Sequence, residues 1–519
     1  MPMITPTKKK SNVASKWDAV AHVREELTEI KPRYELIRDC LKGEYAVKAK
    51  KTKYLPKPNA ADTSDKNEAR YKEYLTRAVF YNVTERTSEG LVGQIFLRNP
   101  MHKLPPLLEP LVKNADGEGL TLTQVAKQAC GHILPYGRGG ILADFPNLDK
   151  QPSKKELDEG TVRPVIKFYS PFDIINWQTE VVNSETVLTM VVLKEYYEKR
   201  EPNSFKVTKY EQYRVLELVD GCTRVTIVKF GDRGDEPATE KYELCDHEEK
   251  PFDRLPFVFC GSENNDAKVD CPPLYNMAIL NLGHFRNSAD YEESCFFIGQ
   301  PTLFLSGLTD QWVKDVLKDK VQMGSRGGIP GPPGSRADLL QVTPNSIAFE
   351  AMKHKEEQMV AIGAKLVERK SGVERKEKEI EIEAASDVSI LTKIAMNIEE
   401  AFVKALEFCA RFVGADAEGI EYEVNKIFDL TSYTPEEVRQ LKEIFESETP
   451  ALLLEEMRGV LERMGITKYE FAEFEIKLEE QQTKRMDMIK KMTEATAPPV
   501  PPGGTGDPNE GGNNNQPGQ

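Results

Sequence analysis

One block of strand-type sequence, flanked on both sides by helix-type sequence, is the feature that most limits how this 519-residue chain can fold. From about residue 161 to 260, runs rich in β-branched and aromatic residues follow one another without a helical segment between them. Asp220-Gly221 joins two of these runs, and this dipeptide favours the type I′ turn of a β-hairpin. Contiguous strands with the helices kept outside them predict an α+β fold.

The N-terminal flank has the period of α-helices. Apolar residues spaced three and four apart predict a helix over residues 23–41, and Pro32 is expected to divide it, because proline breaks a helix interior. A second helical stretch is expected from near Glu68 to Asn99-Pro100. A third, over Thr121–Leu134, leads through a glycine-rich turn into the first strand.

The C-terminal flank has the same period. Helices are expected over Leu274–Gly299, Ile347–Glu368 and Val388–Val413, with a Gly/Pro-rich loop between the first two. Thr434 opens a capping box that begins a further helix. The expected regions are 1–120 (helical), 121–271 (α+β), 272–383 (helix, loop and long helix), 384–496 (helical) and 497–519 (a disordered Pro/Gly/Asn tail).

The sequence lacks the common local motifs of catalysis and metal binding. The eight cysteines contain no CxxC pair, the six histidines form no HxxxH pair, and neither a P-loop nor a GxSxG elbow occurs. We therefore expect no enzyme, no cofactor and no metal. The uncharged runs are too short for a membrane span and no secretory signal is seen, so synthesis in the cytoplasm is expected.

Charge is unevenly distributed along the chain. The whole sequence has 70 basic and 84 acidic side chains, a net charge of −14, which argues against tight DNA binding. Residues 1–53 are net basic and residues 416–480 strongly acidic. The basic segment could contact nucleic acid or an acidic partner, or be an ordinary helix surface. The mixed-charge run Glu368–Glu383 is either a solvated helix face or a seam between subunits.

A series of short segments spread over residues 17–475 resembles the portal proteins of tailed bacteriophages. The closest group is a portal-like phage family catalogued as a domain of unknown function. The order of the segments, and no single motif, carries the resemblance. They are Tyr54-Leu55-Pro56, Ala78-Val79-Phe80-Tyr81-Asn82, Gly90–Phe96, Tyr136–Pro146, Ile174–Trp177, Pro272-Pro273-Leu274, Asn281–Tyr291, Gln300–Leu303, Gly363–Leu366 and Glu383–Ser386.

This resemblance implies a ring, of about twelve subunits, at one vertex of the virion capsid. Each subunit of such a ring has wing, stem, clip and crown regions. Here residues 121–271 would supply wing and clip, Leu274–Gly299 a stem-type helix, and residues 384–496 a helical crown. Double-stranded DNA would pass through the channel without sequence-specific binding. The partners would be the terminase large subunit, tail or adaptor proteins, and capsid and scaffold proteins, with no membrane.

Two groups of residues are candidates for these roles. For the DNA channel they are Arg326, Arg336, Lys353 and Lys355, and for packing between subunits Leu274, Ala278, Leu282 and Phe285. A solvated loop and helix start remains the alternative for the basic residues. For the whole chain, the alternatives are another head–tail adaptor or capsid-associated protein, or a cytosolic enzyme with a dispersed site.

Overall fold

The computed structural model of this chain describes residues 19–146, 156, 162–200, 205–231, 238–299, 302–316, 331–340, 346–367, 389–426 and 428. The chain divides into two compact units, Met1–Phe428 and Asp429–Gln519, and all described residues belong to the first. The expected boundaries at residues 120, 271 and 383 therefore fall within one unit. The helix opened by Thr434, the run Glu368–Glu383 and the tail lie outside the described residues.

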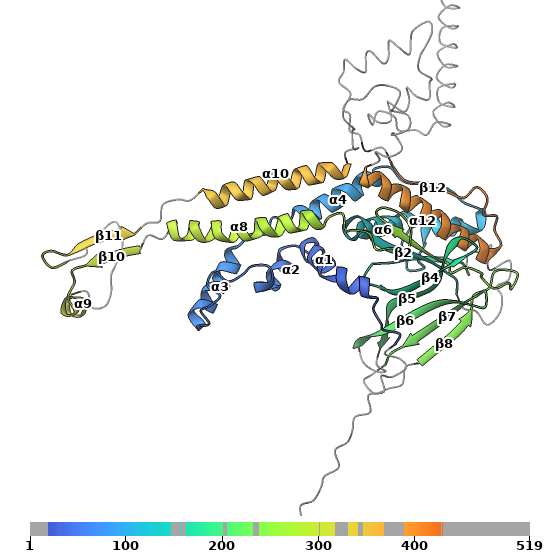
Figure 1. Ribbon diagram of the computed structural model, residues 1–519, viewed down its shortest axis with the longest axis horizontal. Helices are drawn as coiled ribbons and strands as arrows, with labels where there is room; N and C mark the ends of the chain where they lie inside the picture. The colour runs from blue at the N-terminus through green and yellow to red at the C-terminus, as the bar shows by residue number, and fades with distance from the viewer. Residues whose placement is uncertain are drawn as a thin grey trace, which may run out of the picture. The chain divides into compact units, whose positions relative to one another are not determined.

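The strand-type block forms a five-stranded antiparallel sheet whose strands follow one another in chain order (Figure 1). Asp220 and Gly221 have φ angles of 55° and 78°. Both positive values are those of the predicted type I′ turn, so that prediction is confirmed. The strands are β4 (Ile174–Val182), β5 (Glu185–Arg200), β6 (Val207–Val219), β7 (Cys222–Lys229) and β8 (Ala238–Glu243).

A second sheet of three antiparallel strands has β2 at its centre. Helix α6 leads into it, begun by a capping box between Thr121 and Gln124 and ended by Gly137 at φ 79°. Helix α12 packs against this sheet and α6, and together they form the main hydrophobic core. The elements are α6 (Leu122–Tyr136), β2 (Arg138–Asp144), β3 (Val165–Tyr169), β9 (Phe257–Gly261) and α12 (Ile390–Val413).

The N-terminal helices differ from expectation in two places. Pro32 lies inside a single helix, because burial of Leu27, Tyr34 and Ile37 on one face outweighs the one backbone hydrogen bond that proline removes. The second stretch is two helices, because Asn82 caps a new one by accepting from Glu85 N. The helices are α1 (Glu25–Leu41), α2 (Glu44–Ala49), η1 (Lys51–Lys53), α3 (Asp65–Arg77) and α4 (Val83–Ile95).

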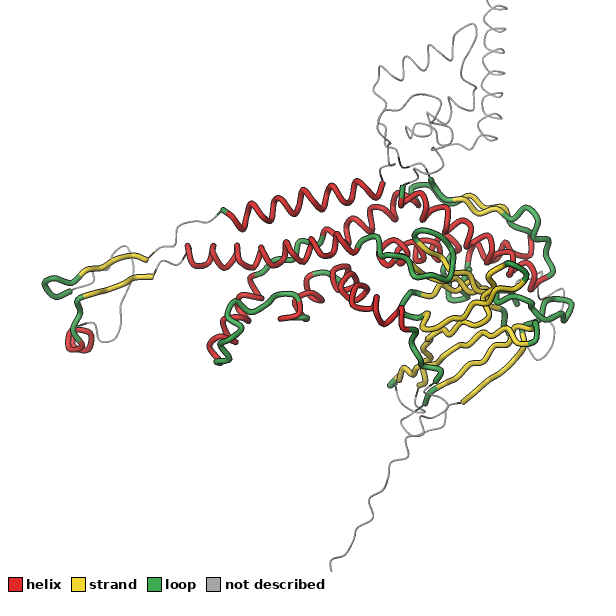
Figure 2. The backbone as a smooth tube through the Cα atoms, in the orientation of Figure 1, coloured by secondary structure: helices red, strands yellow, loops and turns green. Residues whose placement is uncertain are grey.

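Two long helices, α8 (Tyr275–Gly299) and α10 (Ile347–Val367), lie side by side (Figure 2). Between them in sequence come β10 (Thr302–Ser306), α9 (Asp310–Asp315) and β11 (Arg336–Leu340), and the two strands pair in antiparallel fashion. We call α8 and α10 the helix pair. The remaining elements are β1 (Met101–Lys103), which pairs with β12 (Glu421–Glu423), and the short helices η2 (Pro106–Leu108) and α5 (Glu109–Lys113).

Candidate functional site

The basic channel candidates that the structure describes lie on the helix pair and its strands. Arg336 begins β11 and is exposed, and Lys353 is exposed on α10. Lys355 is half-buried, and its Cε lies 3.0 Å from where a β-carbon on Gly283 would be, so its aliphatic stem packs across onto α8. Arg326 lies outside the described residues.

The four residues expected to pack against a neighbouring subunit are covered by their own chain. Leu274 belongs to the main core, whereas Ala278, Leu282 and Phe285 belong to a second cluster formed with α1 and α3. None is more than 2% exposed. The apolar face of α8 that these four residues form is thus covered within one subunit, by α10 on one flank and the N-terminal helices on the other. These side chains are not a free surface.

Polar side chains fix α8 against the N-terminal helices. Tyr74 Oη on α3 donates to Asp290 Oδ1 at 2.6 Å, and burial, together with this carboxylate, raises the pKa of the Tyr74 hydroxyl. Ser288 Oγ accepts from the backbone N–H of Val79 at 3.1 Å. Arg77 forms an ion pair with Glu293. These bonds set both the position and the rotation of α8.

A histidine–carboxylate contact joins α8 to α10. Nε2 of His284 lies 3.0 Å from Oε1 of Glu356, and the imidazole is 2% exposed. The contact fixes the register of one long helix against the other. Polar contacts therefore hold α8 on both flanks, to the N-terminal helices on one and to α10 on the other.

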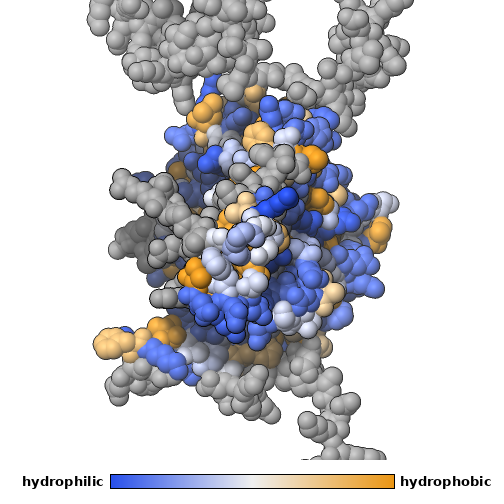
Figure 3. Space-filling view, turned by 90° about the vertical axis from the view of Figure 1, so that its left-hand side faces the viewer, coloured by the Kyte–Doolittle hydropathy of each residue, from blue (hydrophilic) through white to orange (hydrophobic). Residues whose placement is uncertain are grey.

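The surface of the helix pair carries apolar side chains that remain exposed within the subunit. Viewed from the side of β10 and β11, the molecule is mostly hydrophilic with separate apolar patches (Figure 3). The exposed apolar residues of the helix pair and β10 are Ile279, Phe296, Phe297, Phe304, Ile347, Phe349 and Val360. The sequence analysis missed these residues because it considered only the apolar face of α8 that proved to be buried. Apolar residues at the outward positions of α10 were the signal that could have identified them.

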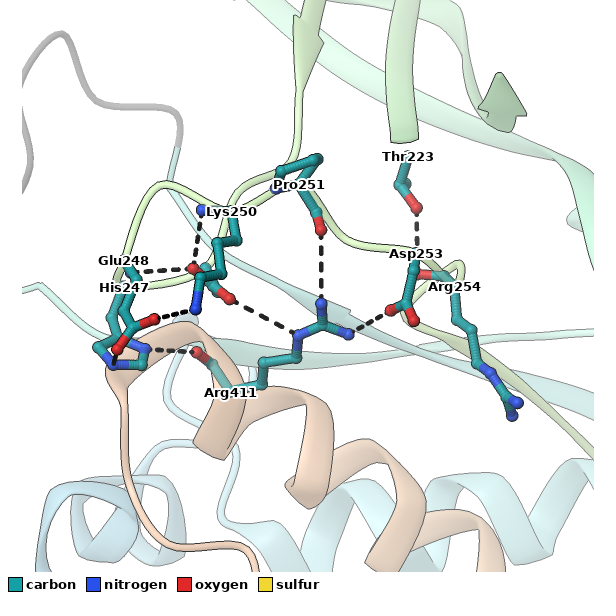
Figure 4. Close-up of polar contacts among 9 residues, drawn as sticks. Thr223, His247, Glu248, Lys250, Pro251, Asp253, Arg254 and Arg411 are labelled. Atoms are coloured by element: carbon teal, nitrogen blue, oxygen red, sulfur yellow. Dashed lines mark hydrogen bonds and ion pairs between the residues drawn. The ribbon is translucent and has the colours of Figure 1, made fainter. Parts of the chain in front are cut away.

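Arg411, at the end of α12, contacts several residues of the segment that connects β8 to β9 (Figure 4). Its guanidinium pairs with Asp253 at 2.6 Å and lies 4.4 Å from the ring centroid of Phe252. Nδ1 of His247 lies 3.4 Å from the Arg411 carbonyl oxygen. These contacts join residues more than 150 positions apart in the sequence and hold a loop against the end of a helix. We therefore interpret the cluster as structural.

A buried charge network joins the two sheets. Arg214 on β6 contacts Glu195 at 2.8 Å and Asp144 at 3.1 Å, and Tyr169 donates to Glu195. Burial raises the pKa of Glu195, but the guanidinium and the hydrogen bonds outweigh it, so the pKa is lowered overall. Burial and the same carboxylate raise the pKa of Tyr169. Each charged side chain of this network has an oppositely charged partner within it, which is typical of a structural network.

A groove of about 450 Å³ lies between α4 and α6, with Glu85, Glu89, Phe96 and Lys127 among its lining residues. Within the described ranges, three or more metal-ligating side chains come together nowhere. Among the described helices, none is both long and apolar enough to cross a membrane.

Comparison with known proteins gives one family match. A family model described as "Domain of unknown function (DUF4055)" matches residues 273–413. The match begins two residues before α8 and ends at the last residue of α12, so it covers the helix pair, the strands between them and α12. Among curated proteins, none matches the sequence.

Among solved structures, the chain is similar to one described as "Neck of empty GTA particle computed with C6 symmetry". The sequences are 13% identical and the TM-score is 0.37, over 76% of this chain and 93% of the other. A TM-score below 0.5 does not establish a common fold.

Proposed function

We propose that this chain is the subunit of a phage portal ring, the channel through which DNA enters and leaves a capsid. The observation that carries the proposal is the ordered series of portal-like segments over residues 17–475. Several of them coincide with structurally decisive positions. Asn281–Tyr291 contains the polar anchors of α8, and Tyr136–Pro146 contains the central strand β2.

The helix pair suits a stem-type role. Its two helices have 25 and 21 residues, and α8 is buried on two flanks and locked by polar side chains. A ring that surrounds moving DNA needs a wall that keeps its position, and two packed helices supply one. Residues 121–271 would form wing and clip, and residues 384–496 the crown.

Charge is compatible with a conduit for DNA. A net charge of −14 per subunit, repeated around a ring, disfavours a tight grip on a sliding polyanion. The basic residues Arg326, Arg336, Lys353 and Lys355 are proposed to give weak, screened contacts in the channel. Terminase, tail or adaptor proteins, and capsid and scaffold proteins are the proposed partners, and no chemical step is assigned to the chain.

The oligomeric state of the purified full chain tests this proposal. Native mass spectrometry and negative-stain imaging are expected to give closed rings of about twelve subunits with a central opening. Only monomers or dimers over a range of salt and protein concentration would contradict it. A ring that docks beneath a separate portal would instead favour a head–tail adaptor.

A further inference from the structure

A basic surface lies on the segment that connects α1 to α3. Residues 31–57 hold nine basic and three acidic side chains. Lys42, Lys51 and Lys53 are exposed here, and Tyr45 on α2 is 90% exposed. We call these four residues the basic face. An aromatic ring this exposed on a charged helix has no packing role within its own subunit.

The charges of the basic face are only partly neutralised by the subunit itself. Lys53 lies 3.3 Å from Glu35, whereas Lys42 and Lys51 have no carboxylate within ion-pair distance among the described residues. The neighbouring Lys48 is already paired with Glu44 at 2.6 Å. The exposed tyrosine is of the residue type that often supplies the anchoring contact of a protein interface. The two lysines without an ion-pair partner leave positive charge that an acidic surface could pair with.

A complementary acidic surface is formed at β12. Asp416, Glu418, Glu421 and Glu423 are all exposed, and no basic residue interrupts them. Ile420 and Tyr422 between them are buried, so the strand directs its acidic side chains outward. We call these four acidic residues the acidic face.

Most of the acidic face lacks a basic partner within the subunit. Glu421 lies 3.4 Å from Lys103 on the paired strand. Among the described residues, Glu418 and Glu423 have no basic side chain within ion-pair distance. The two faces thus carry opposite unpaired charges on different elements of one chain.

We infer that the basic face of one subunit binds the acidic face of the next. The two faces lie apart on the subunit, at α2 and at β12 (Figure 1), so one subunit cannot pair them by itself. A ring is built from such contacts between two different surfaces, repeated until the rotation closes. This inference rests on the proposed ring and names the surfaces that hold it together. The matching charge on the same chain favours a second copy over DNA as the partner.

Charge reversal with rescue tests the pairing in the full chain. The variants K42E/K51E and E418K/E423K are each expected to lower the ring fraction at least tenfold in native mass spectrometry, because each brings like charges together. The quadruple variant is expected to restore rings, since the pairing is re-formed with reversed polarity. Tyr45→Ala is expected to weaken assembly about tenfold or more with an unchanged unfolding midpoint.

A matched control makes the same charge change elsewhere. Lys66 and Lys72 on α3 are exposed, and K66E/K72E is expected to form rings like the wild type. The inference is overturned if either reversal assembles normally, or if the quadruple variant fails to restore rings while each variant remains folded. K42E/K51E rings that form normally but lose salt-sensitive binding of a 20-base-pair duplex would assign the basic face to DNA instead. Absence of rings in the wild type would count against the proposed function, which separates the two failures.

Discussion

The carboxamide oxygen of Asn281, inside α8, accepts a hydrogen bond from the hydroxyl of Thr84 at 2.9 Å. The same oxygen accepts from the backbone N–H groups of Val83 and Thr84 at 3.2 Å each, and the Asn281 amide donates to Tyr81 O at 2.7 Å. Asn281 and Thr84 are both fully buried. One side chain of α8 therefore accepts hydrogen bonds from the first two N–H groups of α4, while Asn82 caps the third.

Asn281→Ala should lower the free energy of unfolding by about 2–3 kcal/mol, because it leaves the N–H group and the hydroxyl of the buried Thr84 without their partner. Urea denaturation of the full chain, followed by circular dichroism, measures the change. Asn276→Ala, an exposed position on the same helix, is the control and should shift the free energy by less than about 1 kcal/mol. Equal effects at the two positions would contradict the anchoring role of Asn281.

Replacing glycine by alanine should stabilise the protein at some positions of this fold and destabilise it at others. A β-carbon at Gly90 or Gly93, both inside α4, would meet nothing within 4 Å. Each Gly→Ala change there is expected to stabilise the protein by about 0.5–1 kcal/mol, because alanine loses less backbone entropy in a helix. At Gly140 a β-carbon would lie 2.2 Å from the Phe257 ring, so alanine should destabilise. Thermal unfolding midpoints compare the three variants, and a lowered midpoint at Gly90 and Gly93 would contradict the expectation.

The end of α12 depends on Gly414, which has φ 67°. A β-carbon there would lie 2.5 Å from the His247 ring, so Gly414→Ala combines backbone strain with a clash and should cost about 2 kcal/mol or more. The double variant H247A/G414A should recover the part due to the clash and keep about 1 kcal/mol due to the positive φ. A double-mutant cycle of unfolding free energies separates the two, and additive effects would show that the imidazole and Gly414 do not interact.

Stability should fall in acid through Glu195. Its folded pKa is lowered below its ordinary value of 4.5, since Arg214 and the hydrogen bonds outweigh burial. A lowered folded pKa stabilises the native state above the unfolded pKa, and this contribution is lost as pH falls below about 4.5. At pH 7, Glu195→Gln should cost about 3 kcal/mol, because Arg214 keeps a buried charge with less compensation.

The difference in unfolding free energy between wild type and Glu195→Gln is therefore expected to narrow between about pH 5 and pH 3. Urea titrations at several pH values measure it. Glu243→Gln, which removes an exposed ion pair with Arg224, is the control and should cost less than about 1 kcal/mol at any pH. If the difference in unfolding free energy between the wild type and Glu195→Gln does not change with pH, the Glu195 carboxylate is not the titrating group.

Local features of the sequence determined most of the secondary structure. The helix expected over Leu274–Gly299 is Tyr275–Gly299, and the one expected over Ile347–Glu368 is Ile347–Val367. The Asp220-Gly221 turn also forms as predicted. Apolar period and turn chemistry act over a few residues, so they can be read from the chain alone.

Long-range packing decided what those features left open. Pro32 remains inside α1, because the buried face of that helix outweighs one lost hydrogen bond. His102 on β1 pairs with Tyr422 on β12, and Arg411 reaches Asp253, across distances in sequence that no local pattern encodes.

The candidate site shows the same division. The sequence by itself identified an apolar α8, the acidic balance of the chain and a basic N-terminal segment. Only the tertiary structure decided that Leu282 and Phe285 are covered within their own subunit, and that Tyr45 and Glu423 are left exposed. The physical reason is that periodicity defines the faces of a helix or strand, whereas burial depends on which distant segment packs against each face.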